Sequence, residues 1–180
     1  MPAPEKTRLA PCSGAVLGEL ARLLNCYSQE MRKAILARSL LCSERRGKTT
    51  IYSFSGDTRI VDRLLKEGEV RTVGVAIAVT TSRGLAPTLG LLSLAASLHI
   101  KPLNHYVVVR EPGATLFLYG RDVLEESVVE LRADPSCGAA PLIVLDEERL
   151  PLGLGAVARK RSQLLIRNVL DAGWYLRSGV

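Results

Sequence analysis

Short β-rich segments follow one another after Asn104, and turn signals such as Pro112-Gly113 and Pro135-Ser136 separate most of them. The segments cover residues 105–110, 115–120, 128–132, 141–148, 150–159 and 164–169. None is long enough to be a stable unit alone, and many short strands at this spacing are typical of a small barrel or sandwich. The last part of the chain is therefore predicted to be a compact β domain.

The first 104 residues have a different pattern, in which helices and strands alternate. Ser13 can cap a helix over about 14–25, because apolar residues recur there at helical spacing. Residues 29–41 fit a helix that turns into a strand. Further expected elements are a turn at 46–48, a strand over 49–54, a helix from Asp57 to Gly68 with Ile60, Val61, Leu64 and Leu65 on its apolar face, a buried strand over 72–81, a turn at 83–84, and a short strand plus a helix within 85–98.

These patterns predict an α+β protein with two domains. Residues 1–104 would form an α/β domain with a mainly antiparallel sheet and flanking helices, and residues 105–180 a small pseudo-barrel. No apolar run reaches ~18 residues, and the N-terminus lacks the pattern of a signal peptide. We therefore expect a soluble, cytoplasmic protein, and we expect a monomer.

The segment 112–128, PGATLFLYGRDVLEESV, places a cation beside an apolar run. Residues 116–119 are predicted to form a short buried strand that Gly120 ends, and a helix is predicted to start at Arg121-Asp122. Free N–H groups and the helix dipole favour an anion at such a start. Arg121 is therefore a candidate anion contact, although Asp122 could simply cap the helix.

The chain carries a formal net charge of +6, which suits an acidic partner, most often nucleic acid. The charge is uneven: acidic residues dominate 122–148, and cations dominate from Arg149 onward. Arginine predominates over lysine, and its planar guanidinium matches phosphate well. A phosphate backbone would thus choose the C-terminal basic face.

Four cysteines, Cys12, Cys26, Cys42 and Cys137, show no paired spacing of the kind that binds zinc. We expect no metal or other cofactor. The cysteines are predicted to be buried thiols, with a Cys12–Cys26 or Cys26–Cys42 disulfide as the alternative in a protein from a hyperthermophile.

Three stretches together resemble a known RNA-binding domain: residues 112–128, LPLGLGAVA at 150–158 and DAGWYLR at 171–177. They are similar to the PUA domain and, more narrowly, to the Nip-seven family of ribosome-biogenesis factors of archaea and eukaryotes. The resemblance implies RNA binding without catalysis during large-subunit assembly, on pre-rRNA that is U-rich or structured. It also implies assembly factors and the exosome as partners, and a nucleolar location for eukaryotic members.

The candidate RNA-binding residues lie mostly near the C-terminus. If 156–161 is a strand, Arg159 and Arg161 share a face and form a two-pronged phosphate contact, with Lys160 on the other face. Gly153 and Gly155 would let an RNA chain approach, or would serve a tight strand crossing. The further candidates are Arg121, Arg167 and Arg177 as cations, and Trp174 and Tyr175 as base-stacking aromatics that could instead seal the barrel core.

Two rival function classes remain at this point. An RNA-modifying enzyme would need a nucleophile, for which Asp57 is the available carboxylate, yet a helix cap explains Asp57 equally well. The chain has no Walker-type loop, no GxGxxG after a strand and no Ser/His/Asp set that we can defend. A protein-interaction scaffold could use the apolar stretch 85–98, although that stretch also fits a core helix.

Overall fold

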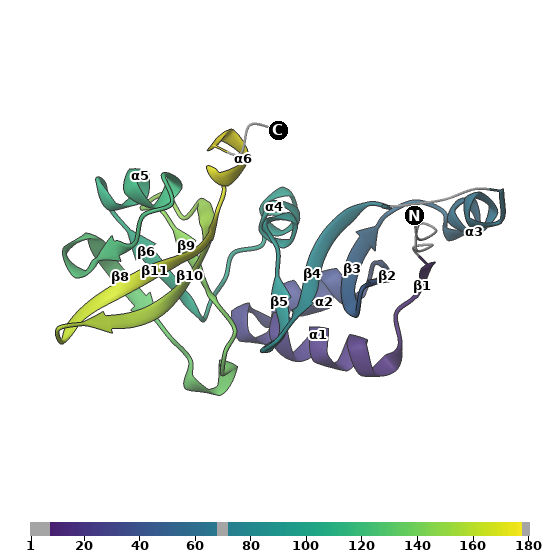
Figure 1. Cartoon of the computed structure of the whole chain (residues 1–180), viewed down its shortest axis with the longest axis horizontal. Helices are drawn as coiled ribbons and strands as arrows, with labels where there is room; N and C mark the ends of the chain where they lie inside the picture. Colours follow the sequence, from purple (N-terminus) through teal and green to yellow (C-terminus); the bar gives the residue numbers. More distant parts are fainter. Residues whose placement is uncertain (1–7, 68–71, 178–180) are drawn as a thin grey trace.

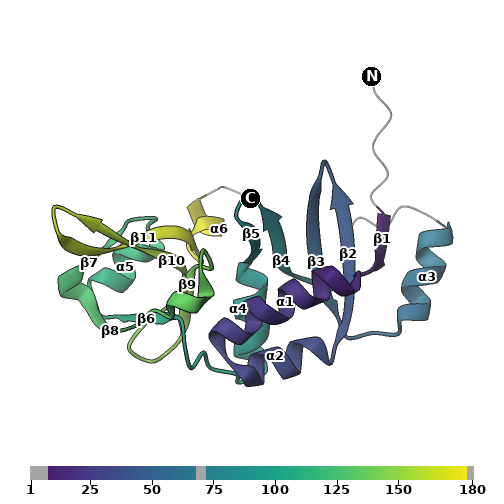
Figure 2. The ribbon, with the colours of Figure 1, turned by 90° about the horizontal axis from the view of Figure 1, so that it is seen from below.

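The computed structural model of the chain describes residues 8–67 and 72–177. Its two halves lie side by side, and each is built on one sheet (Figures 1 and 2). The N-terminal half holds an antiparallel meander in the order β1-β2-β3-β4-β5. Its strands are β1 (Arg8–Pro11), β2 (Ser39–Arg45), β3 (Lys48–Phe54), β4 (Val75–Thr81) and β5 (Gly84–Pro87).

Four helices accompany this sheet: α1 (Gly14–Tyr27), α2 (Gln29–Leu36), α3 (Thr58–Glu67) and α4 (Leu89–Ser97). The Ser13 hydroxyl accepts the Val16 N–H at 3.4 Å, as the capping prediction requires. Ser28 ends α1 and caps α2, because its hydroxyl accepts the Met31 N–H at 2.9 Å. Helices α1, α2 and α4 share one apolar core with β3 and β4, so the stretch around α4 is a core helix.

Helix α3 lies at the outer end of the N-terminal half (Figure 2). Asp57 precedes it and accepts the Arg59 N–H at 2.9 Å, which agrees with its predicted role as a cap. Val61 is buried but Ile60 is 57% exposed, so the predicted apolar face is narrower than expected. Gly68 and the side chains of Leu64 and Leu65 lie outside the part that the structure describes.

The C-terminal half is a curled six-stranded sheet in the order β7-β11-β10-β9-β6-β8. Neighbouring strands are antiparallel except for the parallel pair β6–β9. The strands are β6 (Tyr106–Val109), β7 (Val123–Leu124), β8 (Val128–Arg132), β9 (Leu142–Leu145), β10 (Pro151–Lys160) and β11 (Gln163–Asp171). Helices α5 (Gly113–Leu118) and α6 (Trp174–Arg177) and the 3₁₀ turns η1 (Glu125–Ser127) and η2 (Pro135–Cys137) complete this half.

Strands β6 and β9 join the halves, because their two faces belong to different cores. In β6, Tyr106 and Val108 pack in the core of the N-terminal half, while Val107 and Val109 pack around Phe117 of α5. Strand β9 repeats this alternation, and all its residues are buried. A strand covered on both sides reads as a continuous apolar run. The two halves are thus packed directly against each other.

The prediction for residues 116–124 is wrong in its order of elements. A helix, α5, ends at Leu118, and the strand β7 follows at Val123–Leu124. Gly120 has φ of 80°, and the Arg121 N–H bonds the Leu116 carbonyl at 3.0 Å, which is a Schellman helix end. A short apolar run fits a helix or a strand equally well, and here one helical face packs into the barrel.

The cysteine prediction is also wrong, because all four cysteines are paired. Cys12 bonds Cys42 where β1 lies beside β2, with a Cα–Cα distance of 4.9 Å. Cys26 at the end of α1 bonds Cys137 in η2, with a Cα–Cα distance of 5.6 Å. The second pair joins the two halves across 111 residues. The spacing of the cysteines in the sequence could not identify these two pairs, because tertiary packing brings the partners together.

Candidate RNA interface

The hairpin β10–β11 carries a cluster of exposed cations. Its tip reaches the end of the molecule opposite α3 (Figure 1). Arg159, Lys160 and Arg161 are all exposed there. Leu164 still packs against the barrel core, and Leu165 pairs with Leu124 of β7, so the hairpin is covered up to these residues. The three cations lie at the tip that follows them.

The strand predicted to place Arg159 and Arg161 on one face is one residue too short. Strand β10 ends at Lys160, and Arg161-Ser162 is a two-residue turn with φ of 50° and 72°. Turns of this kind match the twist of antiparallel strands. Arg159 pairs with Leu164 and Lys160 with Gln163, so these two cations lie on opposite faces as predicted. The tip thus presents cations on both faces and in the turn.

Arg167 adds a fourth exposed cation to the same hairpin. It pairs with Ala156, which is four residues before Lys160, so Arg167 and Lys160 share a face about 13 Å apart along the strand. Within residues 8–67 and 72–177, neither these two cations nor Arg159 and Arg161 form an ion pair. All four guanidinium or ammonium groups can therefore receive a ligand anion.

Gly153 and Gly155 serve strand packing and do not line an RNA surface. Both are buried. A Cβ at Gly153, where φ is 155°, would overlap the Leu170 carbonyl on the neighbouring strand. A Cβ at Gly155 would lie 2.7 Å from the Ile166 side chain and 2.9 Å from that of Val144. Of the two roles considered, the tight strand crossing is the one realised.

Arg177 is engaged inside the domain. Its guanidinium donates to the Leu118 carbonyl at the end of α5 and lies 2.9 Å from the carboxylate of Asp171, which is only 3% exposed. A Cβ at Gly173 would overlap that same carbonyl. This junction explains Asp171, Gly173 and Arg177 of the C-terminal motif and gives Arg177 a structural role.

Arg121 is exposed but does not lie at a helix start. Its own N–H is used by the end of α5, so the free N–H groups expected there are absent. Asp122 does not cap a helix either, since its Oδ1 accepts the Asn168 N–H of β11 at 2.9 Å. Arg121 has no ion pair among the described residues and follows Tyr119, which is 66% exposed. It remains a candidate cation, two residues after an exposed tyrosine in the sequence.

The two predicted stacking residues differ in what can be said of them. Trp174 is 47% exposed, so it does not seal the barrel core. The side chain of Tyr175 lies outside the described part of the structure.

Arg132 and Arg149 belong to a network of hydrogen bonds around Tyr106, so their charges are already paired. The sequence patterns did not predict this network. Glu130 accepts from the Tyr106 hydroxyl at 2.7 Å, from Arg132 at 2.8 Å and from Arg149 at 2.6 Å. Both guanidinium groups also lie over the Tyr106 ring. The hydrogen bonds from Tyr106 and Arg149 lower the pKa of Glu130 to about 2. Only the strand pairing of β6 with β8 reveals this cluster.

The described residues contain no group of three or more His, Cys, Asp or Glu side chains that could hold a metal ion. Over the same ranges, no helix has both the length and the apolar character that are needed to cross a membrane.

Solved structures of archaeal proteins share this fold. A hypothetical protein from Pyrococcus horikoshii matches with a TM-score of 0.58 and 16% identity, over 94% of this chain and 99% of that one. A conserved PUA-domain protein from Thermoplasma acidophilum matches with a TM-score of 0.53 and 15% identity, over 95% and 99%. These likenesses show the fold, which defines the molecule as an α+β protein with a PUA domain.

Sequence comparisons identify the family. The family model described as the UPF0113 PUA domain matches residues 105–180. A UPF0113 protein of Aeropyrum pernix is 31% identical over 132 residues, which cover 73% of this chain and 70% of that protein. The chain belongs to the UPF0113 family.

Proposed function

We propose that this protein binds RNA through its PUA domain, with the hairpin β10–β11 as the main contact. One observation carries the proposal: the hairpin presents four exposed cations that form no ion pair with any described residue, namely Arg159, Lys160, Arg161 and Arg167. Such cations can displace counterions from a phosphate backbone. Arg121 and Tyr119 are both exposed and lie two residues apart in the sequence, so they offer a second, smaller contact that would suit an unstacked base.

The biological role that we propose is assembly of the large ribosomal subunit, on pre-rRNA and in the cytoplasm. The resemblance of residues 112–128, 150–158 and 171–177 to the Nip-seven family supports this role. Assembly factors and the exosome are the protein partners that the same resemblance suggests. They remain part of the proposal.

The proposed role involves no catalysis. Asp57, the carboxylate weighed as a nucleophile, accepts from the Arg59 N–H and lies 2.8 Å from the Arg59 guanidinium. These bonds lower the pKa of Asp57 and occupy both its oxygens. Capping of α3 and pairing with Arg59 account for Asp57 without a catalytic role.

The test is RNA binding measured by fluorescence anisotropy across a salt series, with U-rich and A-rich single strands. The double variant Arg159→Ala/Arg161→Ala should weaken binding about tenfold or more, because two charge-assisted contacts are lost. It should also reduce the slope of log K against log salt by about 1.4.

Arg45→Ala/Arg46→Ala is the matched control. It removes the same charge from the β2–β3 hairpin, where Arg46 occupies a turn position with φ of 50°, as Arg161 does. Equal losses in both variants would mean that only net charge matters and would contradict the assigned surface.

A further inference from the structure

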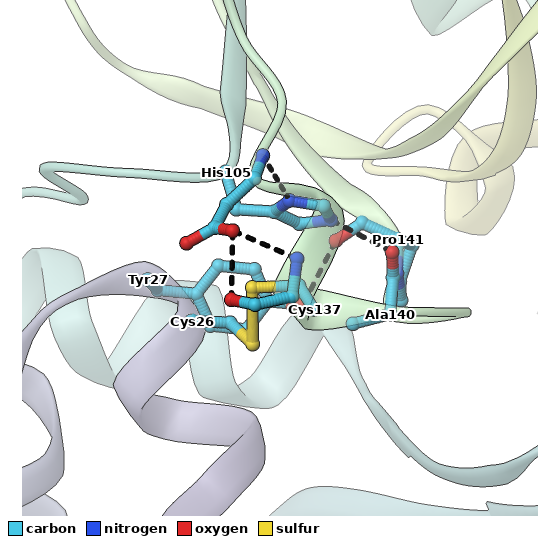
Figure 3. The surroundings of a disulfide bond; sticks show 8 residues. Cys26, Tyr27, His105, Cys137, Ala140 and Pro141 are labelled. Carbon is cyan, nitrogen blue, oxygen red and sulfur yellow. Dashed lines mark hydrogen bonds between the residues drawn. A yellow bond between two sulfur atoms is a disulfide. The ribbon is translucent and has the colours of Figure 1, made fainter.

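A polar groove of about 430 Å³ lies where the two halves meet, and the proposed function does not use it. Three segments form its walls: α1, the turn between β4 and β5, and the loop around η2. The disulfide Cys26–Cys137 lines it and ties the α1 wall to the η2 wall (Figure 3). Both halves of the molecule therefore contribute to one concave surface.

Hydrogen bonds next to the disulfide hold the groove in shape (Figure 3). The Tyr27 hydroxyl donates to the Pro141 carbonyl at 2.9 Å. His105 accepts the Asp134 N–H at Nδ1 and donates from Nε2 to the Ala140 carbonyl at 2.8 Å. Since each ring nitrogen has its own partner, the neutral imidazole is fixed in one tautomer. The groove is thus preformed and pays little ordering entropy when a ligand binds.

The carboxylates in the groove are engaged, while the cations are free. Oε1 of Glu19 accepts the Leu85 N–H at 2.9 Å. Oδ1 of Asp134 accepts the N–H and hydroxyl of Ser136, which lower the pKa of Asp134. Arg22 and Arg83 are exposed and form no ion pair in the described part of the chain. Two guanidinium groups from different segments are therefore available at one groove.

This combination suits an unpaired nucleotide. Arg22 and Arg83 can hold a phosphate, and a guanidinium plane can also stack on a base. Asn25 offers amide donors and an acceptor for a base edge, and the remaining carboxylate oxygens can accept from a ribose hydroxyl or a base amino group. A protein segment is a less suitable ligand than a nucleotide, because more of the surface that lines the groove is polar than apolar.

We propose that this groove is a second RNA site, which holds one unpaired nucleotide of a strand that also contacts the β10–β11 hairpin. The inference rests on the proposed function, since it assumes that the protein binds RNA. It assigns the N-terminal half a direct part in RNA recognition. A longer RNA would then bind more tightly than one that reaches the hairpin alone.

The experiment compares single-stranded RNA of about 6 and about 25 nucleotides, which lie within and above the range of about 4–16 nucleotides that one small domain covers. We expect Arg22→Ala/Arg83→Ala to weaken binding of the long strand about tenfold and to lower its salt slope by about 1.4, with the short strand unaffected. Arg159→Ala/Arg161→Ala should weaken both strands. Arg45→Ala/Arg46→Ala again serves as the control of equal charge.

The outcomes separate the two proposals. If wild-type protein binds neither strand, the proposed function fails and the groove inference fails with it. If the hairpin variant loses affinity and the groove variant binds the long strand like wild type, only the groove inference is overturned, and the groove would be left for a protein partner.

Discussion

At the scale of single residues, two arginines that look alike in the sequence have opposite roles. Arg161 is exposed in a turn and has no ion pair among the described residues, while Arg177 is bonded to the Leu118 carbonyl and to buried Asp171. Charge alone does not separate them, because the difference lies in what each guanidinium reaches. A carbonyl at a helix end attracts a cation, and a buried carboxylate requires one.

Arg177→Ala should therefore reduce stability and leave RNA contacts intact. We expect a loss of about 2–3 kcal/mol in the free energy of unfolding, because the buried Asp171 carboxylate loses its charged partner. Urea denaturation measures this loss, and anisotropy below the transition measures RNA affinity. Weaker RNA binding at unchanged stability would contradict this role and would indicate that Arg177 contacts RNA.

The Glu130 network gives a prediction for pH. The pKa of Glu130 is lowered from 4.5 to about 2, so the ionised carboxylate stabilises the fold fully above its unfolded pKa. That contribution is lost as the pH falls from about 4.5 through about 2. The difference in the free energy of unfolding between wild type and Glu130→Gln should thus be constant above about pH 5. It should become smaller as the pH falls from about 4.5 to about 2. Urea midpoints from pH 2 to 7 measure it, and a difference independent of pH would contradict the assignment.

At the scale of elements, two hairpin turns have similar φ angles but consist of different residues. The β2–β3 turn uses Arg46-Gly47, with φ of 50° and 71°, and the β10–β11 turn uses Arg161-Ser162, with φ of 50° and 72°. Glycine enters the left-handed region without a steric cost, and serine does not. The β10–β11 hairpin therefore ends in the less favourable of the two turns.

Ser162→Gly should stabilise the protein by about 0.5–1 kcal/mol. The change removes the steric strain of serine in the left-handed region, and this gain exceeds the cost of the greater conformational entropy that glycine has in the unfolded chain. RNA affinity should stay within twofold, since no cation changes. Thermal unfolding and anisotropy test both parts. Gly47→Ser, the converse change in the other hairpin, should destabilise by a similar amount and serves as the matched comparison.

At the scale of the whole molecule, the two halves act as one packed body. They share an apolar core through β6 and β9, a disulfide between α1 and η2, and hydrogen bonds around Tyr27 and His105. The groove proposed as a second RNA site exists only because the halves are held together in this way.

The two disulfides should differ in their contributions to stability. They close loops with sequence separations of 30 and 111 residues. In the chain-entropy model the longer loop gives about 1 kcal/mol more stabilisation. Cys26→Ala/Cys137→Ala should therefore unfold at a lower temperature than Cys12→Ala/Cys42→Ala. A thiol count on denatured, non-reduced protein should find none free, and four free thiols would contradict both bridges.

Much of the fold could be predicted where local physics decides it. The Ser13 cap and the β2–β3 turn follow from side-chain chemistry within a few residues, and so does the existence of β4, although it begins at Val75 and only two of its residues are buried. The order of α5 and β7 could not, because an apolar run of four residues satisfies both periods. The Tyr106–Glu130 network and both disulfides needed contacts between distant segments.

The candidate site also has features that follow from local sequence and features that depend on tertiary contacts. The sequence by itself determined that a basic, arginine-rich C-terminal segment lies on a turn-rich β domain, since charge and alternation are local properties. Only the tertiary structure decided which cations are free, because ion pairing depends on what lies across a strand or a helix end. Arg159, Lys160, Arg161 and Arg167 stay without ion pairs among the described residues, whereas Arg132, Arg149 and Arg177 are taken up by carboxylates that folding brings beside them.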